Sequence, residues 1–498
     1  MEHTYYCYPG LELGNCSTVI IGKDASATGQ FIVGHNEDDE DCVAQTHLVP
    51  RMKHEPGSFV QFADASAVIP QVEETYAYYW SEIRRKGGIS FADGFINEWG
   101  LAIVTDSCRP SRDASGCPKD NPEAYGLGYA LRRLVAERAK TAREGVQIMA
   151  ALVEEFGYFS SRSYHLVDKD EAWVVQIPKG YNCVAKRLEN DHVYYIPNWF
   201  TIHQIDFNDK ENYYWSENLV PHAIEQGWYT PAKEGDWSDF DFAKVYQEGS
   251  MKEFNIMRAR NAWFLLSGKV LPDEELKPFS MKALKKYTTA DVKQILRTHY
   301  ENTPDDTTEG GTKNPHRGYS SPTTICNAST VESQIIEFND DPQLIRMLRT
   351  APRPCLAPYT PWYPLALTAI PRGYEWLTVE ASQETHFQVD DSEMFFDDGK
   401  AFWAFKLLGY LTEFDYWNTH GPIHESIAKL EAIWDEEQAG IEKMYHTMKS
   451  MNPTMSKAHL ESYTHRCAQL SWNWAKQMIT YLGEQKTMAN VYSREGDD

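Results

Sequence analysis

The chain has 498 residues, of which 42% are hydrophobic, so it can form one large layered domain or a core with an appended region. Its 48 Lys and Arg are outnumbered by 72 Asp and Glu, and the net charge of −24 argues against nucleic acid and anionic membrane as partners, because both bind clustered positive charge. The chain has no apolar run of roughly 18 residues and no signal-peptide pattern, and its nine cysteines lack disulfide-framework spacing, so we expect a cytoplasmic protein.

The most informative stretch is residues 15–38, which read NCSTVIIGKDASATGQFIVGHNED. Two β-rich runs, residues 17–21 and 31–34, are separated by a turn-rich interval that contains Gly29, and this pattern predicts a hairpin or two adjacent strands. Cys16 opens the first run, and Asp38 follows the second. On that geometry Cys16 and Asp38 lie at the same end of the sheet.

A cysteine beside a carboxylate at a chain start could act as an N-terminal nucleophile. The α-amine, with a pKa of about 8, would serve as the general base for the thiol, and Asp38 would orient that amine. This chemistry requires cleavage of the Asn15–Cys16 bond and loss of a leader, residues 1–15, which the thiol itself could achieve. The alternative is that Cys16 is a small buried hydrophobic residue at the edge of a core strand.

Further along the chain, apolar runs predict strands and periodic patterns predict helices. Residues 39–57 are interpreted as a loop. Strands are expected at residues 89–95, 101–105, 172–177, 183–186, 193–196, 323–327 and 333–338. Helices are expected at residues 127–138, at 141–157 with a capping box from Thr141 to Glu144, and at 255–266, 289–299, 402–411, 424–448 and 459–481.

The segments CSTVIIGKDAS and GHNED resemble the N-terminal signature of the peptidase C69 dipeptidases, which are N-terminal nucleophile (Ntn) hydrolases. The resemblance continues through ISFADGFINEWGLAIVTDS (residues 89–107) and VYYIPNWFTIHQID (residues 193–206) and covers most of the chain in order. It implies an α+β fold, the four-layer αββα Ntn-hydrolase sandwich of two mainly antiparallel sheets. We expect a leader at residues 1–15, this core at residues 16–395, and a helical C-terminal extension at residues 396–498 that packs on the core.

Four other residues are candidates for the site, and for Asn198, Arg258 and His35 the resemblance implies the role. Asn198 would stabilise the oxyanion, although a strand-end asparagine can simply cap a turn. Asn97 has the same two readings, and the chemistry of its turn alone accounts for it. Arg258 would lie near the nucleophile and bind substrate, or form a surface ion pair. His35 stands where the family has arginine, so it would offer the substrate a pH-dependent cation, or be a satisfied core residue.

Other chemistries find little support in the sequence. It contains no HExxH, CxxC or GxSxG motif. His420 and His424 are four residues apart, but Gly421 and Pro422 are expected to interrupt the helix between them. No metal or organic cofactor is therefore expected.

The residues together predict an autoprocessed cysteine hydrolase of small amide bonds, with dipeptides bearing a free N-terminus as the favoured substrate. One alternative is the same mechanism acting on N-acyl amino acids or conjugated amides. Another is an unprocessed, non-catalytic binding protein of the family. The expected partner is a small peptide or amide, with no nucleic acid and no membrane, and a homo-oligomer is compatible with the sequence.

Overall fold

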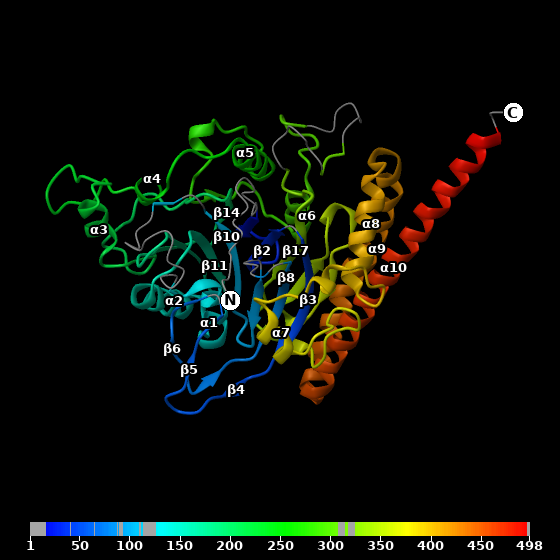
Figure 1. Ribbon diagram of the computed structural model, residues 1–498, viewed down its shortest axis with the longest axis horizontal. Coiled ribbons are helices and arrows are strands. Elements are labelled where there is room, and N and C mark those ends of the chain that lie inside the picture. The colour runs from blue at the N-terminus through cyan, green and yellow to red at the C-terminus, as the bar shows by residue number, and fades with distance from the viewer. Residues whose placement is uncertain are drawn as a thin grey trace.

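The structure is a computed structural model that describes residues 16–39, 41–63, 65–86, 88, 93–108, 111–112, 126–306, 314–316 and 324–495. The expected leader, with Asn15 and Cys7, lies outside these residues, as do residues 89–92 of the strand expected at 89–95. Two large antiparallel sheets stack face to face and helices cover their outer faces (Figure 1), as the predicted αββα sandwich requires.

The first sheet carries the N-terminal hairpin at its centre. In the described residues its strands follow the order β16-β14-β1-β2-β17-β18-β19. Their bounds are β1 Ser17–Ile21, β2 Ile32–Asp38, β14 His192–Ile196, β16 Met281–Lys282, β17 Thr330–Glu337, β18 Arg346–Thr350 and β19 Thr360–Trp362. Ser17 pairs with Asn36 and Ile21 with Ile32, so the expected pairing of the first two strands is confirmed.

The second sheet follows the order β15-β13-β12-β11-β10-β9-β8-β3 in the described residues. Its strands are β3 Cys42–Val49, β8 Tyr78–Arg85, β9 Gly94–Asn97, β10 Ala102–Ser107, β11 Arg162–Val167, β12 Ala172–Ile177, β13 Val184–Arg187 and β15 Tyr213–Trp215. Two short two-stranded ribbons lie in the connection between β3 and β8. One pairs β4 Met52–Lys53 with β7 Glu74–Thr75, and the other pairs β5 Phe59–Val60 with β6 Ile69–Pro70.

Strand alternation divides the apolar side chains between three cores. Ile20 and Val33 meet Val104 and Val174 between the sheets. The outer face of the second sheet packs on α1 Leu131–Arg138 and α2 Ala142–Phe156. The outer face of the first sheet packs on α5 Glu253–Ser267 and α6 Thr289–Arg297. Shorter helices, α3 Leu219–Glu225, α4 Phe242–Tyr246 and α7 Val379–Thr385, lie in the connections.

The C-terminal region is helical, with α8 Ala401–Glu413, α9 Tyr416–Met451 and α10 Pro453–Glu495. The long pair α9 and α10 packs together along one side of the sandwich, and the end of α10 projects beyond the rest of the molecule (Figure 1). Contacts of α10 with β19 and of α8 with β3 join this region to both sheets.

Three sequence predictions are wrong. Residues 42–49 form β3 instead of a loop. Described residues 324–327 form no strand, because this side of β2 is filled by β17, which begins at Thr330. Gly421 and Pro422 do not interrupt α9, which runs continuously through both residues, and the rings of His420 and His424 lie 5.1 Å apart on one face of this helix.

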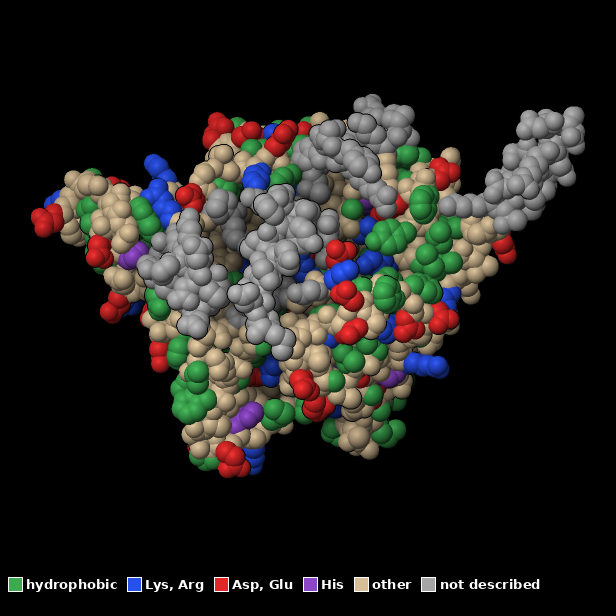
Figure 2. Space-filling model, viewed as in Figure 1, with side chains coloured by type: hydrophobic (Ala, Val, Ile, Leu, Met, Phe, Trp, Pro, Cys, Tyr) green, Lys and Arg blue, Asp and Glu red, His purple; other side chains and the backbone are tan. Residues whose placement is uncertain are grey.

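The surface mixes charges of both signs, and the visible face in Figure 2 shows Lys and Arg scattered among Asp and Glu. Hydrophobic side chains gather on this face over α8 (Figure 2). Exposed aromatic residues on and beside α8 are Phe395, Phe396, Tyr410 and Phe414. None of the described helices combines the length and the apolar composition that a bilayer crossing requires.

Candidate active site

Cys16 lies directly before β1, and its thiol is buried against the second strand of the hairpin. The Sγ atom donates a hydrogen bond to Oε1 of Glu37 over 2.7 Å. Because Ser17 pairs with Asn36, the hairpin register places Glu37 opposite Cys16. The pairing of the strands therefore brings a carboxylate to the thiol, and that carboxylate belongs to Glu37.

A chain of hydrogen bonds continues from Glu37 into the space between the sheets. Its Oε2 atom is 3.0 Å from Nε2 of His35, and Nδ1 of His35 is 2.8 Å from the hydroxyl of Thr18. Thr18 donates to a carboxylate oxygen of Asp106 on β10 of the facing sheet. Five buried side chains thus connect the thiol to both sheets.

His35 is held at both ring nitrogens, and its side chain is 5% exposed. Burial alone would lower the pKa of His35, but the hydrogen bond and charge of Glu37, with the charges of Asp106 and Asp38, raise it above its usual value. The surrounding carboxylates therefore favour the protonated form of His35. The sequence offered two interpretations of His35, a satisfied core residue or a cation of the site. In the structure His35 is both hydrogen-bonded in the interior and part of the polar cluster around Cys16.

Asp38 ends β2 and is also buried, but its hydrogen bond runs to a loop. Its Oδ2 atom accepts from Nδ2 of Asn327 over 2.6 Å. Burial raises the pKa of Asp38 to about 7, although the Arg258 guanidinium and hydrogen bonds from Thr330 and Asn327 oppose that rise. Burial similarly raises the pKa of Asp106 to about 6.

The thiol of Cys16 is held in its neutral form. Burial raises its pKa well above the usual value, and the charges of Glu37, Asp106 and Asp38 raise it further. A nucleophilic thiolate would need a cation or a base beside it. In the described residues the thiol itself donates only to Glu37, so activation requires a group such as a free α-amine at Cys16.

Arg258 and Asn198 complete the surroundings of Cys16. A single guanidinium nitrogen, Nη2 of Arg258, donates over 2.6 Å to the carbonyl oxygen of Cys16 and over 2.6 Å to Oδ1 of Asn198. Asn198 has a φ of +56°, a left-handed conformation that asparagine tolerates better than most residues, and its Nδ2 donates to the carbonyl of Ser107. The structure therefore brings Cys16, Arg258 and Asn198 together.

Asn97 has a different environment. Its Nδ2 donates to the carbonyls of Ala136 and Ala139, at and just beyond α1, and its Oδ1 accepts from the backbone of Trp99 and Leu101. These bonds occupy the amide on the outer face of the second sheet. Asn97 closes the turn between β9 and β10, which is the structural role that its turn chemistry predicts. None of its hydrogen bonds in the described residues reaches the Cys16 cluster.

Three polar residues of the cluster were not singled out from the sequence. Glu37 was part of the GHNED segment, but the role beside the thiol was assigned to Asp38. Thr18 and Asp106 belong to apolar strands and alternate with core residues. The period of two along each strand is the one signal that could have found them, because it places Thr18 on the same face as Cys16.

Comparisons with known proteins agree with the sequence resemblance. A sequence model described as peptidase family C69 matches residues 15–429. A probable dipeptidase of Latilactobacillus sakei is 27% identical over 318 residues, which cover 62% of this chain and 65% of that protein, slightly less than two thirds of its length. Probable dipeptidase B of Streptococcus pyogenes serotype M1 is 27% identical over 399 residues, which cover 76% of each chain.

Among solved structures, a mutant conjugated bile acid hydrolase from Clostridium perfringens aligns with 10% identity and a TM-score of 0.30, over 68% of this chain and 89% of that one. A similarity of this size carries no argument about the site.

Proposed function

Because the chain belongs to peptidase family C69, we propose that it is an autoprocessed N-terminal cysteine hydrolase that cleaves dipeptides. The observation that carries this proposal is the position of Cys16: its thiol and carbonyl are both held, by Glu37 and Arg258, at the start of a central strand. The names of the relatives, probable dipeptidases, support the substrate class.

In the proposed maturation, the thiol of Cys16 attacks the carbonyl carbon of Asn15, and the peptide nitrogen of Cys16 leaves as the new α-amine. Water then hydrolyses the thioester and releases residues 1–15. The amine so formed is the general base that the buried thiol lacks. Asp38, whose carboxylate is anchored by Asn327 at the same end of the hairpin, is proposed to orient it.

In the proposed reaction cycle, the α-amine accepts the thiol proton while Sγ attacks the substrate carbonyl. Asn198 supports this step because Nδ2 carries two hydrogens and donates one of them to Ser107, so the second can donate to the oxyanion. Arg258 fixes the orientation of that amide through Oδ1. The protonated amine then gives its proton to the leaving amine, and water hydrolyses the acyl-enzyme.

A substrate with a free ammonium group fits the charge of the cluster. Three carboxyl groups, those of Glu37, Asp38 and Asp106, lie near two basic groups, His35 and Arg258, so the described side chains offer more hydrogen-bond acceptors than cations, although burial raises the pKa of Asp38 to about 7. An ammonium ion is stabilised in such surroundings, whereas an N-acyl group gains nothing from them. This favours dipeptides over the N-acyl amino acids that the same mechanism could hydrolyse.

The experiment combines intact mass with substrate preference. We expect purified protein to begin at Cys16 and to hydrolyse a dipeptide with a kcat/KM at least about 10-fold higher than its N-acetyl derivative, since a charged hydrogen bond contributes about 1.5 to 3 kcal/mol. A higher kcat/KM for the N-acetyl compound would assign the protein to the acylase alternative. An intact leader with no hydrolysis of either compound would assign it to the non-catalytic alternative.

A further inference from the structure

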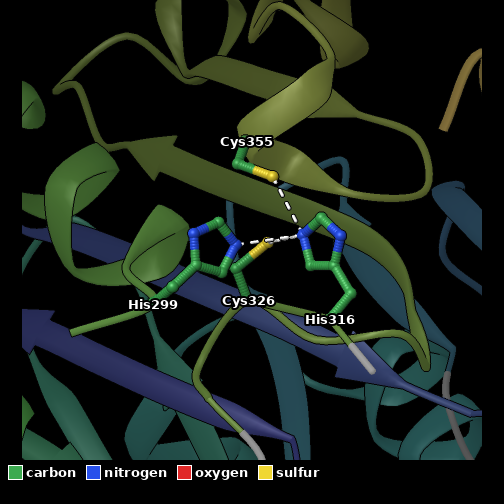
Figure 3. Close-up of side chains that lie close together, drawn as sticks. All are labelled: His299, His316, Cys326 and Cys355. Atoms are coloured by element: carbon green, nitrogen blue, oxygen red, sulfur yellow. Dashed lines mark hydrogen bonds between the residues drawn. The ribbon is translucent and has the colours of Figure 1, made fainter. Parts of the chain in front are cut away.

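Four potential metal ligands lie together in the loops beside β17. They are His299, two residues beyond α6, His316 in the described stretch 314–316, Cys326 before β17, and Cys355 in a turn of 3-10 helix. All four are at most 5% exposed. Figure 3 shows their two imidazole rings and two sulfur atoms directed toward a common centre.

The distances between these atoms approach those of a tetrahedral zinc site. Bond lengths of about 2.0 to 2.1 Å to nitrogen and 2.3 Å to sulfur require ligand atoms roughly 3.3 to 3.8 Å apart. Nε2 of His316 lies 3.0 Å from Nε2 of His299, 3.1 Å from Sγ of Cys355 and 3.7 Å from Sγ of Cys326 (Figure 3). All four ligand atoms lie within 4.8 Å of one another.

A carboxylate lies close to the other nitrogen of each histidine, as a hydrogen-bond partner for His299 and as an ion-pair partner for His316. Nδ1 of His299 is 2.7 Å from Glu301, and Nδ1 of His316 is 3.1 Å from Glu413, which also pairs with Arg353. Such carboxylate–histidine pairs fix which ring nitrogen is free to bind a metal. Both histidines are thereby oriented with Nε2 toward the centre.

The apposed Nε2 atoms indicate a ligand rather than a simple hydrogen bond. Without a metal, one of the rings must donate to the other across 3.0 Å while two thiols share the same buried space. The ring of Tyr416, at the start of α9, lies 5.6 Å from that of His316 and 6.1 Å from that of His299 and covers the cluster. A cluster with four inward ligands and no open position is the pattern of a structural site.

We propose that His299, His316, Cys326 and Cys355 bind one structural Zn²⁺ ion. The two thiols lose their protons on binding, so two thiolates balance the charge of the ion and two protons are released. The ion joins the end of α6, the 314–316 stretch, the approach to β17 and the 354–356 turn.

The metal site also borders the candidate active site. Residues on both sides of Cys326 bind β2: the carbonyl of Ile325 accepts from Asn36, and Asn327 donates to Asp38. Zinc binding at Cys326 therefore holds the loop that anchors the Asp38 carboxylate. The ion supports the site and takes no part in bond cleavage.

The test is the metal content of full-length protein purified without chelators from zinc-supplemented medium. We expect about one zinc per chain in the wild type, and in Cys467→Ser, which alters a buried thiol outside the cluster. Cys326→Ser and Cys355→Ser are expected to fall below about 0.2 zinc per chain, because removal of a thiolate weakens a four-ligand site strongly. X-ray absorption of the wild type should show two sulfur and two nitrogen ligands, and this result does not depend on whether the variants fold.

The proposal is overturned by wild-type protein that contains no zinc, by a Cys326–Cys355 disulfide detected as a 2-Da mass loss, or by a zinc environment without sulfur. The Cys16→Ala protein separates this inference from the proposed function. That variant is expected to be unprocessed and inactive but to retain about one zinc, so loss of activity and loss of metal are read independently.

Discussion

At the scale of single residues, the decisive feature is the burial of Cys16 against Glu37, because burial first and the nearby carboxylates second leave the thiol neutral until a base is available. Cys16→Ala is expected to block leader removal and to lower hydrolysis by at least about 1000-fold, as loss of a nucleophile does. Intact mass and kcat/KM measure the two effects. Cys7→Ala and Cys467→Ala are the controls, and an effect of Cys7→Ala on processing without one of Cys16→Ala would contradict the assignment.

The pKa of Asp38 predicts a pH dependence of stability. Its folded value of about 7 exceeds the unfolded value of about 3.9, so between these pH values the folded state binds more protons than the unfolded state. The free energy of unfolding should therefore fall as pH rises from about 4 to 7. Asp38→Asn should remove the part of this fall that Asp38 contributes, leaving the parts due to Asp106 and Asp93, whose pKa values burial raises to about 6.

Urea unfolding at several pH values, with both proteins carrying Cys16→Ala so that no new amine forms, measures this slope. Asparagine can still accept the hydrogen bond from Asn327, which keeps the loop contact in place. An unchanged slope would show that Asp38 is ionised in the folded protein throughout this range.

His35 should make activity depend on pH. Its pKa lies above the usual value of about 6.5, so its charge is present below the raised pKa and is lost as pH rises through it. His35→Arg should keep the charge and flatten this limb of the kcat/KM profile, and should shift preference toward substrates with a carboxylate. His35→Gln, which is neutral at all pH values, should lack the same limb at lower activity. Profiles identical in all three proteins would remove His35 from the site.

At the scale of elements, the hairpin could be predicted because its β-branched runs end in clear turn residues. α2 could also be predicted: Thr141 caps it by accepting from Glu144, and Gly157 ends it. β3 could not be predicted, because the residues in the middle of this strand are polar. Gln45 and His47 are buried on it through hydrogen bonds to Glu82 of β8, a partner 35 to 37 residues away.

The metal cluster and the position of Glu37 also could not be predicted from local sequence patterns. The metal cluster joins residues spaced 17, 10 and 29 apart, which matches no local motif, and only tertiary structure brings them together. Glu37 could be placed beside Cys16 only once the strand register was known. Sequence patterns therefore located the thiol and its hairpin, but not the side chains that reach it across the sheets.

The packing of α6 on β2 predicts the effect of a single methyl group. A Cβ at Gly34 would lie 2.4 Å from a methyl of Val292 and 2.9 Å from one of Val19, so the helix must move away from the strand. Gly34→Ala is expected to destabilise the fold by about 1 to 3 kcal/mol, as overpacking does. Gly440→Ala, on an open face of α9, should instead stabilise by up to about 1 kcal/mol through helix propensity. Urea unfolding measures both, and equal values would contradict this packing.

At the scale of the whole molecule, the helical region is joined to the sandwich by polar contacts as well as apolar ones. Glu431 of α9 accepts hydrogen bonds from Arg297 and Lys293 of α6 and from the backbone of Tyr359 beside β19. Its side chain is 9% exposed. The family match also runs beyond residue 395 into α9, to residue 429, so the boundary at 395 stays a prediction.

Glu431→Ala should therefore loosen the contact between the helices and the sandwich. Removing one partner of a buried ion pair leaves the Arg297 charge without its carboxylate and Lys293 with only Asp435, at 3.9 Å, which costs about 3 to 5 kcal/mol. Glu425→Ala on the same helix breaks an exposed pair with Lys429, four residues away, and should leave stability unchanged. If the helical region were only an appendage, Glu431→Ala would melt the helices alone. If it is part of one cooperative unit, as these contacts indicate, circular dichroism and tryptophan fluorescence should report a single transition at a lower urea concentration.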